Sequence, residues 1–199
     1  SDVYKRQVRI RRKRMNFFIR KEKKEDYKIT EEVVKEAFAN EEYSDQSEHR
    51  LVASLRNSDE FIPDLSLVAL HRDKIIGHIL LSKIFIVKGE KSIESLALAP
   101  VSVLPNYQNK GVGQSLIQKS LEVAEKLNFD SVIVMGHSEY YPKFGFKKAS
   151  NWGIKAPFEV PDEFLMAIEL KKNALDKTSG IIQYSCLLYT SDAADERSS

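Results

Sequence analysis

Residues 98–117 read LAPVSVLPNYQNKGVGQSLI, and this stretch decides both the fold and the kind of ligand to expect. In it an apolar strand ends in a turn, and the run from Gln108 to Gly113 leads into an amphipathic helix. The first amides of a helix have no partner inside it, and the helix dipole adds partial positive charge there. Glycines at 111 and 113 let a bulky anion approach the backbone without meeting a Cβ. The pattern predicts an anion-binding turn suited to a diphosphate.

Two other phosphate-binding patterns fail on this stretch. A dinucleotide-binding fingerprint requires a third glycine at position 116, which is Leu116. A P-loop requires Gly-Lys-Ser or Gly-Lys-Thr, and the chain contains neither triplet. From the residues alone, the alternative is a tight turn that requires its glycines for steric reasons and binds no anion.

The rest of the chain alternates between strand and helix patterns. Apolar spacing of three and four predicts helices over 26–40, 46–57 and 111–127, and a short helix over 139–144. Apolar or alternating runs predict strands over 16–20, 65–71, 74–87, 93–104, 131–135 and 163–170. Residues 61–64 read as a turn, and Pro100 inside a strand indicates a bulge. The order β-α-α-β-β-β-α-β-α-β predicts an α+β fold with a mostly antiparallel sheet.

The stretch 98–117 resembles motif A of the GNAT acetyltransferase superfamily, with its Gln/Arg-x-x-Gly-x-Gly/Ala signature after a splayed strand. Downstream, Tyr141-Pro-Lys-Phe-Gly-Phe146 resembles the Tyr-x-x-x-Gly-Phe ending of the same superfamily. The segments GHSEYYPKFGF and FIPDLSLVA are similar to the bacterial acetyltransferases called YhbS-like. The resemblance covers residues 15 to about 185 and implies a splayed central sheet flanked by helices.

From this resemblance the expected cosubstrate is acetyl-CoA. Its pantetheine arm would pair with the backbone of Val101, Ser102 and Val103 as an added strand. Its pyrophosphate would meet the turn and the first helical residues, namely Gln108, Lys110, Gly111, Val112, Gly113, Gln114 and Ser115. Lys110 either reaches the 3′-phosphate or is a solvated turn lysine.

The implied activity is transfer of an acetyl group to a primary amine of a small molecule or protein. The resemblance makes Tyr141 the candidate acid for the departing sulfur, with Tyr140 as the lesser candidate. His137 is a candidate base or acceptor contact, with a structural histidine as the alternative, and Glu94 is a candidate base, with a surface carboxylate as the alternative. The first two helices would form the acceptor wall, with candidates Glu42, Asp45, Glu48 and His49. A non-catalytic acyl-CoA sensor and an enzyme for longer acyl groups or oxygen acceptors stay open.

The two ends of the chain require a separate interpretation. Residues 1–7, SDVYKRQ, can be encoded by DNA whose reverse complement, in a shifted frame, gives CLLYTS, as at 186–191. We interpret both ends as translated sequencing adaptor, expect the native start at Met15, and exclude 1–14 and 186–199 from a single acetyltransferase domain at 15–185. A genuine basic tail that binds nucleic acid is the alternative.

This interpretation changes the charge and cysteine arguments. Removing the eight basic and four acidic residues of the ends from 31 and 29 leaves 23 and 25, a net charge of −2. We therefore expect no nucleic-acid partner. Cys186, the only cysteine, falls in the adaptor, and no apolar run is long enough for a membrane span. We expect a cytoplasmic monomer or homodimer, with neither a metal site nor a membrane partner.

Overall fold

The structure is a computed structural model, and it describes residues 15–185. The adaptor interpretation of 1–14 and 186–199, including Cys186, therefore concerns residues outside the described range. Strands are β1 Phe18–Lys21, β2 Phe61–His71, β3 Lys74–Lys88, β4 Lys91–Val103, β5 Ser131–Met135, β6 Lys147–Lys148, β7 Ile154–Lys155, β8 Leu165–Glu169 and β9 Gly180–Gln183. The α-helices are α1 Tyr27–Phe38, α2 Glu48–Arg56 and α3 Val112–Lys126. Short 3-10 helices are η2 Lys24–Asp26, η3 Pro105–Tyr107, η4 Tyr141–Phe144, η5 Ala149–Trp152 and η6 Asp162–Phe164.

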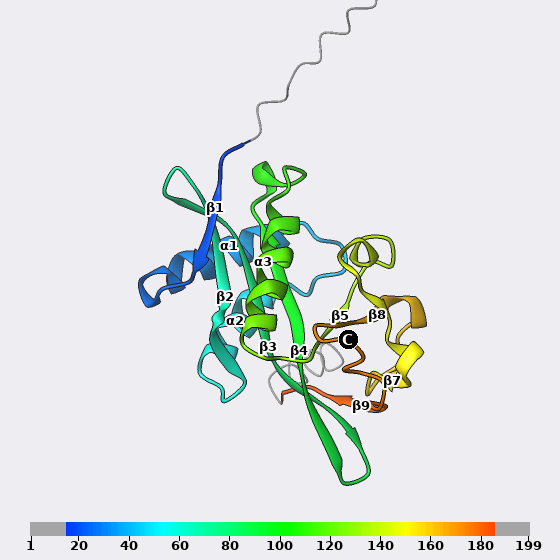
Figure 1. Ribbon diagram of the computed structural model, residues 1–199. Coiled ribbons are helices and arrows are strands. Elements are labelled where there is room, and N and C mark those ends of the chain that lie inside the picture. Colours follow the sequence, from blue (N-terminus) through cyan, green and yellow to red (C-terminus); the bar gives the residue numbers. More distant parts are fainter. Residues whose placement is uncertain (1–14, 186–199) are drawn as a thin grey trace, which may run out of the picture.

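The nine strands form one sheet in the order β1-β2-β3-β4-β5-β8-β6, and β9 joins β3 to β7. Most neighbours are antiparallel, while β4 and β5 are parallel because α3 connects them. One face of the sheet packs against α3, and the opposite face packs against α1 and α2 (Figure 1). The predicted mixed α+β class with a mostly antiparallel splayed sheet is confirmed.

Of three local predictions, the first was wrong and the other two were confirmed. Residues 61–64, predicted as a turn, belong to β2, whose pairing with β3 is irregular between Phe61 and Ser66. The short helix predicted over 139–144 is present as the 3-10 helix η4 over Tyr141–Phe144, and it ends at Gly145, which takes a positive φ. The bulge predicted at Pro100 is present, because Leu98 and Val101 pair with Leu81 and Ile79 and leave two residues of β4 unmatched.

A buried polar network fastens α1 and α2 to the edge of the sheet. The Arg56 guanidinium makes two hydrogen bonds to the Glu22 carboxylate, at 2.7 and 3.2 Å, and a third to Glu31 at 2.9 Å. The Ser66 hydroxyl donates to Glu22 at 2.9 Å and lies 2.9 Å from His78 Nε2. Because the single Ser66 proton goes to Glu22, His78 donates from Nε2 to Ser66. This bidentate ion pair lies almost wholly out of solvent, so its partners depend on each other.

His78 makes this network sensitive to acid. Burial lowers the pKa of His78 to about 4 from its ordinary 6.5, partly offset by the nearby Glu22 carboxylate. Between pH 6.5 and 4 the unfolded chain takes up a proton at this residue that the folded protein does not. The free energy of unfolding therefore decreases as the pH is lowered. We predict a loss of about 3 kcal/mol in the free energy of unfolding from this residue across that range.

The variant His78→Gln, which keeps a donor for Ser66, should remove this part of the pH dependence. Urea unfolding of wild type and variant at pH 4.5 and 7 measures it. His71→Gln, which changes a histidine outside the network, is the matched control. An equal pH dependence in wild type and His78→Gln would contradict the assignment.

Candidate active site

The site begins where β4 and β5 separate. The two parallel strands pair only at Leu96 with Val132 and at Ala97 with Ile133. Beyond Ala97, β4 continues for six residues to Val103, and no described strand pairs with it on the β5 side. The backbone of 101–103 therefore offers an open strand edge to a ligand with amide groups.

The turn after β4 presents free amides next to this open edge. The 3-10 helix η3 follows β4, and Gly111 then takes a φ of 85° at the N-cap of α3. The Ser115 amide already donates to the Gly111 carbonyl at 3.0 Å, so the amides of Val112, Gly113 and Gln114 remain without a helical acceptor. Their dipoles add at the end of a fifteen-residue helix, which favours an anion there.

A pocket of about 360 Å³ joins the open edge to this helix start. It is lined by Val103, Tyr107, Gln108, Asn109, Gly111, Gly113, Gln114, Tyr140 and Lys143. Five of the sequence-predicted cofactor residues are thus brought together, namely Val103, Gln108, Gly111, Gly113 and Gln114. The Gln108 side chain donates to the Val103 carbonyl at 3.1 Å, so it fixes the turn against the end of β4.

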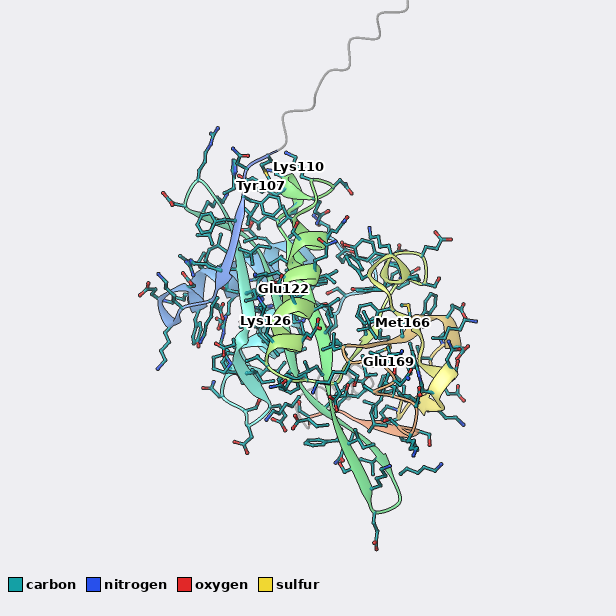
Figure 2. The ribbon with its side chains drawn as sticks, viewed as in Figure 1. Tyr107, Lys110, Glu122, Lys126, Met166 and Glu169 are labelled. Carbon is teal, nitrogen blue, oxygen red and sulfur yellow. The ribbon has the colours of Figure 1, made fainter. Side chains whose placement is uncertain are left out.

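The other predicted cofactor residues lie around the pocket without lining it. Val112 and Ser102 are 1% and 2% exposed as whole residues, so neither side chain is open to a ligand. Lys110 lies over the Tyr107 ring, with Nζ 5.9 Å from the centroid, at the start of α3 (Figure 2). The figure also places Glu122 and Lys126 further along the same helix, where they form a surface ion pair.

Lys143 is a lining residue that the sequence reasoning missed. Its Nζ lies 4.0 Å from the centroid of the Tyr140 ring, on the far wall of the pocket from the glycines. A Cβ on Gly113 would lie 3.8 Å from the Tyr140 hydroxyl, which shows how closely that wall approaches α3. From the sequence, Lys143 could be placed only in a short segment after β5. The tertiary structure shows that it lines the same pocket as residues of the 108–114 segment. A cation here complements a phosphate.

Tyr141 and Tyr140 have different surroundings. The Tyr141 side chain is 8% exposed and packs in the main core, edge to face with Phe146. Its ring occupies the space beside Gly136, where a Cβ would overlap the ring. Burial, with a smaller effect of Tyr140, raises the pKa of Tyr141 to about 12. Tyr140 is half-buried and faces the pocket, and burial also raises its pKa.

The remaining catalytic candidates lie in three different places. The His137 carbonyl accepts the amides of Tyr140 and Tyr141, at 3.1 and 3.4 Å, and its side chain is exposed. Glu94 lies on the β3–β4 hairpin, 3.8 Å from Lys83, and lines none of the pockets described here. Seven residues of extended strand separate Glu94 from Val101, about 23 Å. Glu94 therefore lies at the opposite end of β4 from the open edge.

The predicted acceptor-wall residues shape the connection between α1 and α2. The Asp45 carboxylate accepts the amide and hydroxyl of Ser47, and Glu48 accepts the Ser44 hydroxyl. Glu42 is exposed, and one ring nitrogen of His49 is buried without a partner among the described residues. Within residues 15–185, no group of three His, Cys, Asp or Glu side chains is arranged to hold a metal. No helix of this range has the length and hydropathy to span a bilayer.

Comparison with known proteins agrees with this geometry. Residues 27–146 match the model of the acetyltransferase (GNAT) family. The chain therefore belongs to the GNAT acetyltransferase family. The match runs from the start of α1 to the Gly-Phe pair after η4, so it includes the open edge, the turn and the pocket.

The similarity to individual relatives extends over different lengths. The uncharacterized N-acetyltransferase YjhQ of Escherichia coli K12 is 40% identical over 115 residues, which are 57% of this chain and 63% of that protein. A GNAT acetyltransferase of Brucella melitensis, solved with acetyl-CoA, is 28% identical at a TM-score of 0.72 and covers 87% of this chain and 99% of its own. YhbS of Escherichia coli, solved with CoA, has a TM-score of 0.79 at 20% identity over 88% of this chain and 93% of its own.

The anion site can be tested by one charge placed at Gly111. We predict that Gly111→Glu lowers the affinity for CoA by more than about 100-fold, because its carboxylate would meet the phosphates. The positive φ should also lower stability by about 1–2 kcal/mol. Isothermal titration with CoA and thermal unfolding measure the two effects.

Gly89 supplies the matched control. It lies in the β3–β4 turn with a φ of 60°, and a Cβ there, as at Gly111, has no heavy atom within 4 Å. Gly89→Glu should lose similar stability and bind CoA as the wild type does. Unchanged CoA binding by Gly111→Glu would show that the phosphates lie elsewhere.

Proposed function

We propose that residues 15–185 form an acetyl-CoA-dependent N-acetyltransferase that acetylates a primary amine. The observation that carries this proposal is the open edge of β4, which leads directly to the free amides at the start of α3. An extended ligand with amide groups and a diphosphate fits this order of features. Acetyl-CoA and CoA, with which the Brucella and YhbS structures were solved, are ligands of this kind.

In the proposed binding mode each part of the cosubstrate has its own protein partner. The pantetheine arm pairs with the backbone of 101–103, and the pyrophosphate accepts hydrogen bonds from the amides of 112–114. Gln108 holds the turn in place through the Val103 carbonyl. Lys143 supplies positive charge across the pocket, and Lys110 lies close enough to the turn to meet a peripheral phosphate.

The proposed reaction is direct transfer. The lone pair of a neutral amine attacks the thioester carbonyl, the tetrahedral intermediate collapses with cleavage of the C–S bond, and the thiolate takes up a proton while the amine nitrogen loses one. An amine of pKa about 10.4 is neutral in about one molecule in 2,500 at pH 7, a cost of about 4.6 kcal/mol. The thioester is already activated, so positioning supplies much of the rate.

We propose Tyr141 as the proton donor to the departing sulfur. Burial raises the pKa of this phenol to about 12, so it stays protonated through the physiological range but is a weaker acid than an ordinary tyrosine. The ring is held in one position by Gly136 on one side and by the edge-to-face contact with Phe146 on the other. His137, at the turn that positions both tyrosines, is the candidate to receive the amine proton, directly or through water.

Tyr141→Phe should lower kcat by about 100-fold and leave the KM for acetyl-CoA within about threefold, because only the hydroxyl is lost. Steady-state kinetics with an accepted amine measure both values. Tyr27→Phe is the control for removal of a hydroxyl elsewhere, because Tyr27 is half-buried on α1 against the Arg56 guanidinium, away from the pocket. If Tyr140→Phe causes the loss of kcat and Tyr141→Phe does not, the donor is Tyr140.

The activity itself is tested by release of free CoA thiol from acetyl-CoA over a panel of primary amines, with mass spectrometry of the acetylated product. We expect amine-dependent thiol release with a matching gain of one acetyl group. Tight binding of acetyl-CoA without release across the panel would reject the N-acetyltransferase proposal. It would leave a non-catalytic acyl-CoA-binding protein.

A further inference from the structure

A second, shallow and open cavity also borders Tyr140. Its volume is about 530 Å³, and it is lined by His137, Ser138, Glu139, Tyr140 and Phe164. The residues come from two segments, the turn after β5 and the 3-10 helix η6 before β8. Tyr140 is the one residue that lines both this cavity and the anion pocket, so its side chain forms their common wall.

Main-chain hydrogen bonds hold this cavity in shape. The Gly136 amide donates to the Phe164 carbonyl at 3.0 Å, which continues the β5–β8 pairing by one step and ties the two segments together. The Tyr140 amide donates to the His137 carbonyl at 3.1 Å and closes the turn between them. The walls are therefore set by the sheet and not by a long loop.

The cavity flanks the path of the pantetheine arm. β5 runs parallel to β4 and ends at Met135, so the turn that carries His137 and Tyr140 leaves the sheet on the side of the open edge, and Tyr140 lines the same pocket as Val103. A ligand on the open edge of β4 would have residues 135–140 on its other side. An acceptor in this cavity would thus lie beside the cosubstrate, as direct attack requires.

The charges on the two sides of Tyr140 are opposite. The anion pocket is lined by Lys143 and by no carboxylate, whereas the second cavity is lined by Glu139 and by no lysine or arginine. Glu139 is exposed and forms no ion pair among the described residues. Phe164, 36% exposed, adds an apolar surface next to this carboxylate. One carboxylate and one aromatic wall suit a ligand with one positive charge and one apolar group.

We propose that this cavity is the acceptor site, and that its substrate is a small monoamine with an apolar group. Glu139 holds the ammonium group, Phe164 packs against the apolar group, and Tyr140 separates the amine from the anionic half of the cosubstrate. After loss of its proton, to His137 or water, the amine attacks the thioester and releases CoA. This proposal rests on the N-acetyltransferase function and adds the substrate class and its binding residues. A polyamine would leave further charges without carboxylates in this cavity.

The test compares benzylamine with ethylamine and spermidine as acceptors for the full-length protein. We expect kcat/KM for benzylamine to exceed that for ethylamine by about tenfold or more, because only benzylamine fills the aromatic wall. Phe164→Ala should reduce this ratio to nearly one. Glu139→Gln should raise the KM for benzylamine by about tenfold and leave the KM for acetyl-CoA unchanged.

Two variants serve as matched controls. Phe158 is 37% exposed and lines a different pocket, so Phe158→Ala removes an equally exposed aromatic ring without touching the cavity. Glu159→Gln does the same for an exposed carboxylate in that pocket. Both should keep the preference for benzylamine. Equal effects of the cavity and control variants would overturn the proposal.

Binding without turnover separates this proposal from the function on which it rests. Isothermal titration of benzylamine into the CoA-saturated protein should show one site, weakened by Glu139→Gln. If acetyl transfer occurs but prefers spermidine or ignores the Glu139 and Phe164 variants, the acceptor site is wrong and the N-acetyltransferase function stands. If benzylamine binds as expected and no amine is acetylated, the function fails while the binding site stands. If benzylamine neither binds nor reacts, the acceptor site is overturned.

Discussion

The separation of β4 from β5 is the constraint on which the rest of the site depends. Neighbouring parallel strands normally satisfy the hydrogen-bonding groups of each other's backbone along their shared length. Here the pairing of β4 with β5 stops after Leu96 and Ala97. The bulge at residues 99–100 bends β4 just beyond that point, since bulged strands bend and twist more strongly. Unpaired strand edges are usually covered or blunted. In this protein the edge leads to the start of α3, so the ligand we propose would cover it.

Helices on the two faces of the sheet hold the strands around this opening in different ways. On one face α3 packs through Leu116, Ile117 and Ala124, which fixes the position of its N-terminal amides relative to β4. On the opposite face α1 and α2 are held by apolar contacts and by the Glu22–Arg56 ion pair. Because this pair is buried, loss of one partner would leave an uncompensated charge and loosen both helices from the sheet. We infer that a sheet held by helices on both faces keeps β4 and β5 separated beyond Ala97.

Tyr140 shows how a short turn can organise two environments. Its ring lies under the Lys143 ammonium and contacts Tyr141 and Phe144 edge to face, so its orientation is fixed by aromatic packing. The lysine faces the pocket that suits phosphates, and the preceding Glu139 faces the other cavity. Neighbours in sequence thus present opposite charges to two compartments, which is how we infer that the anionic cosubstrate and a cationic acceptor are kept apart.

The sequence by itself determined the α+β class, the position of α3 and the glycine-containing turn for which we propose anion binding. These features depend on local rules, namely apolar periodicity, glycines at a helix start and the proline that marks a bulge. The same rules failed at 61–64, which belong to β2 despite their turn composition, although only Phe61 of these residues has a partner on β3. They also missed β6, β7 and β9, strands of two to four residues that exist only because other strands bind them. The tertiary structure alone decided that Lys143 faces the glycines and that Phe164 lies beside Glu139. Such contacts join distant segments of the chain, and no local pattern encodes them.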